Sequence, residues 1–173
     1  MYRIFSCPID TDECPKSARR DRERAAEATL LAEAFGEGAT LGHEADGAPF
    51  VEGHPEAEIS ISHCKDLCVL VVDCEPIGVD VEDYRSQLRR VASRFVAPCE
   101  GNPEELTDTQ LLKLWTAKEA IYKVARTPGL GLQEIEVDTE SGLGKARGAT
   151  YRLTFQPLRE ARMLAVAQRV SAE

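Results

Sequence analysis

Long apolar stretches are missing from this 173-residue chain. The longest apolar run, 69–72 with its neighbours, has the length of a β-strand, whereas a membrane-spanning helix needs about 20 apolar residues. We therefore expect no segment that crosses a membrane. The N-terminal sequence MYRIFSCPID also lacks a basic start followed by an apolar stretch. This lack predicts that there is no export signal and that the protein is cytosolic.

A positive charge balance is missing as well. The chain has 21 basic and 30 acidic residues and a formal net charge of −9. Nucleic-acid-binding domains usually present a basic face to the phosphate backbone, so this balance argues against general nucleic-acid binding. An acidic protein can still bind an anion, but it then needs a local basic cluster or a metal ion. A hydrophobic content of 43% is ordinary for a globular chain long enough to have a core.

The cysteines lack the paired spacing of a structural zinc site. There are six: Cys7, Cys14, Cys64, Cys68, Cys74 and Cys99. Cys64 and Cys68 form a CxxxC segment beside His63, but the chain has no convincing second CxxC or HxxxH half. Because thiols stay reduced in the cytosol, we expect small, buried, reduced cysteines. A zinc site is the less favoured alternative.

The first half of the chain has the pattern of a helix followed by three strands. An Ala- and Arg-rich segment without Pro predicts a helix over 17–35, and Gly36 is suited to its C-terminal end. The Gly-, Ala- and Pro-containing segment 36–55 predicts a loop. Apolar runs and alternation then predict strands at 59–63, 67–72 and 77–82. We expect these three strands to form an antiparallel meander.

The second half repeats this order. A helix is predicted over 104–126, with Thr107 and Gln110 as a capping box at its start. Strands follow at 134–138, 150–156 and 163–170, and the segment 141–144 is expected to be a turn. Between the halves, 83–98 predicts a further helix that ends at Pro98.

This repeated pattern predicts an α+β fold. We expect one compact unit, 1–173, made of two similar halves at 1–82 and 83–173. Each half would contain a helix and a three-stranded antiparallel sheet. Two halves in one chain make a monomer the simplest expectation.

Two carboxylates alternate on the third predicted strand. In the segment IGVDVE at 77–82, Asp80 and Glu82 point to the same face as Gly78, because alternate side chains of a strand share a face. Their backbone positions are roughly 7 Å apart, since each residue rises about 3.3 Å. Like charges this close repel unless they are solvated or bridged by a cation. Taken alone, this pattern is also typical of an ordinary solvent-exposed sheet face.

Charged residues also lie on the apolar side of the second long helix. At steps of about 100° its apolar residues form one stripe, and Lys118 falls in the middle of it. Glu119 lies at the edge of the stripe, and Lys123 lies one turn further along on the same side. A snorkelling Lys118 and a surface Glu119–Lys123 ion pair are the simpler interpretation. That interpretation leaves unexplained why three carboxylates and two lysines gather around apolar elements.

These segments resemble a known family. GVDVE at 78–82 and WTAKEA at 115–120, followed by Lys123, resemble the two signature motifs of the 4′-phosphopantetheinyl transferase superfamily. Ile61-Ser62-His63 resembles the Ser-His motif of that family, and Gly129-Leu130 its downstream Gly-Leu segment. The order and spacing agree. The long, surfactin-type branch fits better than the short holo-acyl-carrier-protein-synthase branch, because a full first half precedes the strand with Asp80 and Glu82.

The resemblance implies both a fold and an activity. The implied fold is two similar α+β halves related by a pseudo-twofold axis. The implied activity is that of a holo-[acyl-carrier-protein] synthase, or 4′-phosphopantetheinyl transferase. It moves the phosphopantetheine arm of coenzyme A to a serine of an acyl or peptidyl carrier protein and releases 3′,5′-ADP. Asp80, Glu82 and Glu119 would hold Mg²⁺ against the coenzyme A pyrophosphate.

The resemblance also implies roles for other side chains. The expected catalytic residues are Glu119, as the base for the serine hydroxyl, with Lys123 and His63. The coenzyme A phosphates would be bound by Arg20, Arg24, Ser62, His63, Lys118 and Lys123. The chain departs from the family at Gly47-Ala48-Pro49, where the family often has Gly-Lys-Pro. A lysine that usually contacts the nucleotide is therefore absent.

Arginines follow the strand with the two carboxylates. Carrier proteins are acidic around their modified serine, and Arg85, Arg89 and Arg90 can share one face of the helix predicted there. We expect these three residues to dock the carrier protein.

Two other classes of function stay open. One is a non-catalytic relative that binds coenzyme A or a carrier protein, and the other is a metal-dependent phosphodiesterase or nuclease.

Overall fold

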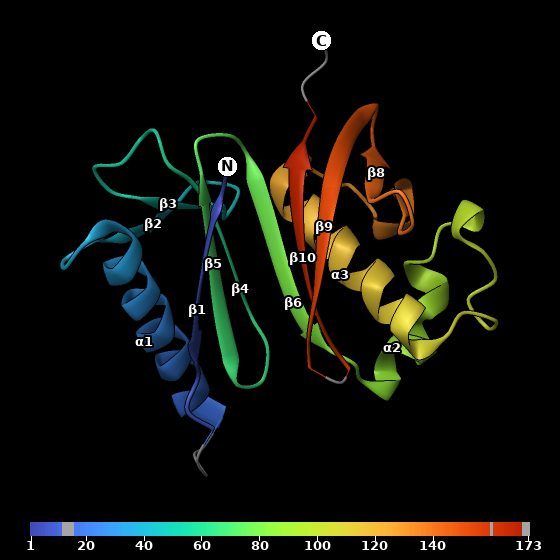
Figure 1. Cartoon of the computed structure of the whole chain (residues 1–173), viewed down its shortest axis with the longest axis horizontal. Coiled ribbons are helices and arrows are strands. Elements are labelled where there is room, and N and C mark those ends of the chain that lie inside the picture. The colour runs from blue at the N-terminus through green and yellow to red at the C-terminus, as the bar shows by residue number, and fades with distance from the viewer. Residues whose placement is uncertain (12–15, 160, 171–173) are drawn as a thin grey trace. The chain divides into compact units, whose positions relative to one another are not determined.

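The computed structural model describes residues 1–11, 16–159 and 161–170. The chain divides into two compact units, Met1–Ile77 and Gly78–Glu173. Figure 1 shows the helices and strands of each unit. Within the described ranges, no helix is both long enough and apolar enough to span a membrane.

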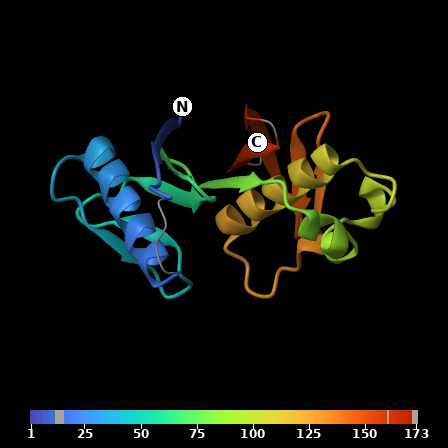
Figure 2. The same cartoon turned by 90° about the horizontal axis from the view of Figure 1, so that it is seen from below.

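The first unit combines a helix, a three-stranded sheet and a hairpin. In chain order its elements are β1 (Arg3–Pro8), α1 (Lys16–Phe35), β2 (Leu41–His43), β3 (Pro49–Val51), β4 (Glu58–His63) and β5 (Leu67–Asp73). β5 lies between β1 and β4 and is antiparallel to both. α1 packs against β1 and β5 (Figures 1 and 2), where Leu30 of the helix is buried with Leu70 of the sheet.

The first unit confirms the predicted helix and the two strands at 59–63 and 67–72, but the predicted meander is wrong. Both edges of β5 are already paired, with β1 on one side and β4 on the other. The strand predicted at 77–82 therefore has no place beside β5. The continuous apolar run of β5 was the available signal, because a strand buried on both faces is typically a central strand.

The loop predicted over 36–55 also needs correction. It contains the antiparallel hairpin of β2 and β3, in which Leu41 pairs with Val51. Gly47 adopts a φ of 87° in the connecting turn, a conformation that glycine reaches at little cost. Three-residue strands are too short for a periodic pattern, so the sequence carried no clear signal for them.

The second unit is built on a five-stranded sheet. Its elements are β6 (Ile77–Asp83), α2 (Ser86–Val91), α3 (Asp108–Ala125), β7 (Ile135–Asp138), β8 (Leu143–Ala146), β9 (Ala149–Arg159) and β10 (Arg162–Arg169), with short 3₁₀ turns at Ala92–Arg94, Pro98–Glu100 and Leu132–Glu134. The strand order is β6-β10-β9-β8-β7. α3 lies against this sheet (Figures 1 and 2), and its buried residues form the core with the strands.

Helix α3 begins at Asp108, four residues later than the predicted start at 104, and it has the predicted residues at its cap. The Thr107 hydroxyl accepts a hydrogen bond from the Gln110 backbone N–H at 3.2 Å, and the Gln110 side chain accepts one from the Thr107 N–H at 2.8 Å. The predicted capping box is therefore confirmed.

Two other predictions in this unit were inaccurate. The helix predicted over 83–98 ends at Val91, after which a 3₁₀ turn brings Phe95 edge-on against Trp115, with ring centroids 5.1 Å apart. Gly144 lies inside strand β8 rather than in a turn. A Cβ at Gly144 would lie 2.3 Å from the Ile121 side chain, so this glycine permits close packing of α3 on the sheet.

Both units thus combine helices with antiparallel sheets, as the α+β prediction requires. The second sheet has five strands instead of the expected three. The pseudo-twofold relation and the halves at 1–82 and 83–173 stay predictions.

Candidate functional site

The site of interest is built where strand β6 meets helix α3. Gly78 of β6 approaches α3 so closely that an added Cβ would lie 2.1 Å from the Ala120 carbonyl oxygen. Two residues on, Asp80 is buried on the same face of the strand. Val79 and Val81, which alternate with it, are fully buried. The missing side chain at Gly78 therefore allows the acidic face of β6 to lie against α3.

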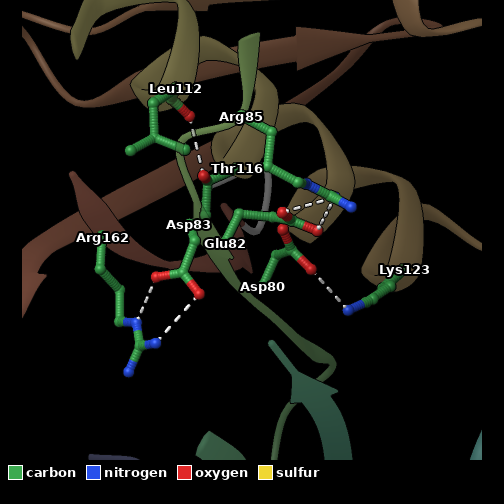
Figure 3. Close-up of polar contacts among 8 residues, drawn as sticks. All are labelled: Asp80, Glu82, Asp83, Arg85, Leu112, Thr116, Lys123 and Arg162. Atoms are coloured by element: carbon green, nitrogen blue, oxygen red, sulfur yellow. Dashed lines mark hydrogen bonds and ion pairs between the residues drawn. The ribbon is translucent and has the colours of Figure 1, made fainter. Parts of the chain in front are cut away.

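Lys123 of α3 holds Asp80 directly. Its ammonium group lies 2.9 Å from Asp80 Oδ1 (Figure 3). It also donates to the Val79 carbonyl oxygen at 2.8 Å. The Lys123 side chain is half-buried, with 31% exposure, and that of Asp80 is 8% exposed. Because the pair is largely shielded from water, each charge offsets part of the hydration that the other has lost.

Glu119 lies one helical turn before Lys123 and interacts with both acidic residues of β6. The pKa of Glu119 is raised to about 6, first by burial and then by the negative charges of Asp80 and Glu82, against the opposing effect of Lys123. The three carboxylates predicted to converge therefore share one electrostatic environment. Among the described residues, their oxygens do not all lie within 4.8 Å of one another.

Glu82 carries a counter-ion of its own. Nη2 of Arg85 lies 3.1 Å from Glu82 Oε1 and 2.8 Å from Oε2 (Figure 3). Burial raises the pKa of Glu82, and the positive charge of Arg85 opposes this shift. Two of the three carboxylates thus bind cationic side chains of the chain itself.

The end of β6 is held by an ion pair that sequence reasoning missed. Arg162 Nε lies 2.6 Å from Asp83 Oδ1, and its Nη2 lies 3.0 Å from Oδ2 (Figure 3). The Tyr84 N–H also donates to the Ala161 carbonyl oxygen at 2.7 Å. Arg162 is buried and lies 79 residues from Asp83 in the chain, so no local pattern linked them. This fork of two hydrogen bonds fixes the strand end next to Glu82.

Lys118 is enclosed in the second unit. Its side chain has 0% exposure, and its ammonium group contacts Glu100 Oε2 at 2.8 Å. The same group donates to the carbonyl oxygens of Leu132 at 3.2 Å and Ile135 at 2.6 Å. An ammonium group has three donors, and all three are used here. This lysine neutralises a buried glutamate, which argues against its predicted contact with coenzyme A.

The predicted coenzyme A residues of the first unit lie around α1 and the end of β4. His63 Nδ1 is 3.5 Å from Glu23 Oε1, and its Nε2 is 3.9 Å from Glu27 Oε1. Ser62 is buried, whereas Arg20 and Arg24 are exposed on α1. Their contacts with coenzyme A stay predictions.

Two cysteines of the first unit match the simpler expectation. Cys64 and Cys68 are buried and carry free thiols, as predicted. Burial raises the pKa of Cys68 to about 12, which disfavours the thiolate that a zinc ligand requires. Cys74 and Cys99 are exposed, contrary to the expectation of burial, and Cys14 lies outside the described residues.

The arginines expected to dock a partner differ in their surroundings. Arg85 binds Glu82, and Arg89 pairs with Asp108 through Nε at 2.9 Å and donates to the Leu106 carbonyl oxygen at 2.8 Å. Arg90 is exposed on α2. An acidic partner would have to compete with internal carboxylates for two of the three arginines.

Comparison with known proteins identifies the family of this chain. Residues 76–166 match the model of the 4′-phosphopantetheinyl transferase superfamily, a range that contains β6, α3 and the carboxylates between them. The chain is 32% identical over 106 residues to a 4′-phosphopantetheinyl transferase of Bacillus subtilis, with 56% of this chain and 47% of the relative covered. It is 31% identical over 86 residues to the 4′-phosphopantetheinyl transferase psf-1 of Bacillus pumilus, with 47% and 37% covered.

A third relative is the 4′-phosphopantetheinyl transferase Sfp of Bacillus subtilis strain 168, which is 30% identical over 83 residues, with 44% of this chain and 37% of the relative covered. The chain therefore spans about half the length of the first of these curated relatives and less of the other two. These similarities are consistent with the surfactin-type branch. Because the family model matches more than half of the chain, this protein belongs to the 4′-phosphopantetheinyl transferase superfamily.

Proposed function

We propose that this chain transfers the 4′-phosphopantetheine arm of coenzyme A to a serine of an acyl or peptidyl carrier protein and releases 3′,5′-ADP. The observation that carries the proposal is the shared environment of Asp80, Glu82 and Glu119, expressed in the raised pKa of Glu119. These residues lie in the range that matches the family, and the relatives are named for this transfer. The cytosolic location and the monomeric state stay predictions.

The donor chemistry of the cluster fits a hard divalent cation such as Mg²⁺. Such ions prefer carboxylate oxygens, and the three carboxylates carry more negative charge than Lys123 and Arg85 neutralise. Asp80, Glu82 and Glu119 would hold the ion. When bound, the ion would offset the charge of a diphosphate and of the departing 3′,5′-ADP.

Glu119 is suited to accept the proton of the serine hydroxyl. With a pKa of about 6 its carboxylate is mostly ionised at neutral pH and is more basic than an ordinary glutamate. As the proton leaves, the serine oxygen forms a bond to the β-phosphorus of coenzyme A. The bond between that phosphorus and the oxygen of 3′,5′-ADP then breaks, so the group is transferred without any change of oxidation state.

Lys123 has two tasks in this proposal. Its hydrogen bonds to Val79 and Asp80 fix the position of the Asp80 carboxylate on β6. Its positive charge, 31% exposed, is also available to offset negative charge on the pyrophosphate. Arg20, Arg24, Ser62 and His63 are proposed to contact the coenzyme A phosphates from the first unit.

The test is mass spectrometry of an apo carrier protein incubated with coenzyme A, Mg²⁺ and this protein. We expect the carrier to gain one phosphopantetheine, and Glu119→Gln to abolish the gain. Glu104→Gln is the matched control, because Glu104 is an exposed glutamate of the same unit. Binding of coenzyme A without product would instead identify a non-catalytic relative, and cleavage of nucleic acid would identify a nuclease.

A further inference from the structure

Both oxygens of Glu82 are bound by one nitrogen of Arg85. Nη2 lies 3.1 Å from Oε1 and 2.8 Å from Oε2, so it occupies the edge of the carboxylate (Figure 3). A divalent cation that bound either oxygen would meet the guanidinium group at close range. Since like charges repel strongly at such distances, the cation and Arg85 would compete for Glu82.

The two cationic side chains beside the carboxylates, those of Lys123 and Arg85, differ in how tightly they are held. Lys123 is 31% exposed and is fixed by a backbone carbonyl as well as by Asp80. The Arg85 side chain is 63% exposed, and in the described chain its hydrogen bonds and ion pair all go to Glu82. The Glu82 side chain is 20% exposed, so the pair is open to water on its arginine side, where ion pairs are weak.

Arg85 can leave Glu82 without disturbing the neighbouring helix. It occupies the N-cap position of α2, with extended backbone angles, but its side chain makes no capping hydrogen bond. The helix therefore loses no capping hydrogen bond when the Arg85 side chain turns to solvent. Lys123, by contrast, links two elements and would have to break its contacts with Val79 and Asp80.

We propose that Arg85 is an internal counter-ion of Glu82 that a divalent cation displaces when it binds Asp80, Glu82 and Glu119. This inference rests on the proposed function, which assigns the cation to these carboxylates. Departure of Arg85 leaves Glu82 able to turn towards the other two. The released arginine then faces solvent, where an acidic partner can reach it.

The test measures metal affinity directly. Mn²⁺ alone is titrated into the whole protein and followed by electron paramagnetic resonance, with Mg²⁺ added as a competitor. We expect Arg85→Gln to bind Mn²⁺ about two- to fivefold more tightly than the wild type, the range that an exposed ion pair is worth. Arg85→Lys keeps a cation beside Glu82 and should stay near the wild-type affinity. Loss of binding in Glu119→Gln would place the ion at this cluster.

Arg94→Gln is the matched control, because it removes the same charge from an exposed arginine of the 3₁₀ turn after α2. An equal gain in Arg94→Gln and Arg85→Gln would overturn the inference, since the effect would then be one of net charge. Unchanged or weaker binding in Arg85→Gln would also overturn it. If that variant still modifies the carrier protein, the proposed function survives while the role of Arg85 fails. If no form binds Mn²⁺, both the ion site and the inference are wrong.

Discussion

Lys123 and Asp80 join α3 to β6 through an ion pair of 2.9 Å. The Asp80 side chain is only 8% exposed, so little water is available to solvate its charge. An ionised carboxylate in such a position depends on a partner, because desolvation disfavours the charged form. This pair therefore contributes to the metal-free fold as well as to the proposed chemistry.

Lys123→Met should lower the free energy of unfolding of the metal-free protein by about 1–3 kcal/mol, because it leaves Asp80 buried without this cation. Added Mg²⁺ should restore part of the loss, since an ion at Asp80 supplies the missing charge. Urea denaturation with and without Mg²⁺ measures both effects. Lys145→Met, which removes an exposed lysine of β8, is the control. Equal stabilisation of wild type and Lys123→Met by Mg²⁺ would argue against Asp80 as a ligand.

Lys118→Met should destabilise the protein by about 3–5 kcal/mol, because it leaves the Glu100 carboxylate as an uncompensated buried charge. The Glu100 side chain is 1% exposed and also accepts hydrogen bonds from Ala97 N at 2.7 Å and Val137 N at 2.8 Å. A glutamine at position 100 can still accept one of these hydrogen bonds. The double variant Lys118→Met with Glu100→Gln should therefore lose less free energy of unfolding than the sum of the losses in the two single variants.

A cycle of urea denaturation curves on the two single variants and the double variant measures this coupling. Purely additive losses would contradict the ion pair. Coenzyme A affinity of the folded Lys118→Met protein should equal that of the wild type, since this lysine is fully buried with Glu100.

Local periodicity explains why much of the acidic site was predictable. The two-residue repeat of a strand places Asp80 on the side of Gly78, and the helical repeat places Glu119 one turn from Lys123. The Thr107 cap could be predicted from its spacing to Gln110. The partner of Lys118 could not be predicted, because Glu100 lies in a short 3₁₀ turn that has no periodic pattern. The position of Lys118 on the helix indicated that its side chain faces the core, but it did not indicate which carboxylate would pair with it.

Strand pairing was harder to predict, because the choice of partner is a long-range property. β1 lies at the N-terminus yet pairs with β5, placing Cys7 opposite Cys68. Its short sequence, RIFSCP, gives little alternation to read. Likewise, Arg162 meets Asp83 only because β6 and β10 are neighbours in the sheet. Neither contact follows from spacing within a single element.

Glu119→Gln should change stability in a pH-dependent way. The folded-state pKa is about 6 against a model-compound value of 4.5, so the folded protein binds a proton more readily than the unfolded chain. Ionised Glu119 therefore costs stability above this range, and the cost disappears as the pH falls through about 6 towards 4.5. In metal-free protein the glutamine variant should be more stable than wild type by about 1–2 kcal/mol in the alkaline range.

Chemical denaturation between about pH 8 and about pH 5 measures this difference, which should fall by more than half across the range. Glu104→Gln, at an exposed glutamate, should show a small and constant difference. With Mg²⁺ present the order should reverse, because wild type alone retains the third carboxylate. A difference that does not change with pH would show that Glu119 is not the group with the raised pKa.

Gly78→Ala should separate β6 from α3 and so test the packing on which the site depends. The new Cβ would lie 2.1 Å from the Ala120 carbonyl oxygen and 3.1 Å from Val124 N, both backbone atoms that cannot rotate away. We expect a loss of about 1–3 kcal/mol in the free energy of unfolding, the usual range for overpacking. Because Lys123 and Glu119 are carried by the same helix, Mn²⁺ affinity should fall as well.

Gly131→Ala is the matched control, since its new Cβ would lie 3.3 Å from a glutamate side-chain oxygen and its φ of −84° suits any residue. Its stability should stay within about 0.5 kcal/mol of wild type. If Gly78→Ala were as stable as this control, β6 and α3 would not pack this closely. Asp80 and Glu119 would then lack the proximity that raises the pKa of Glu119, and a shared ion would have no basis.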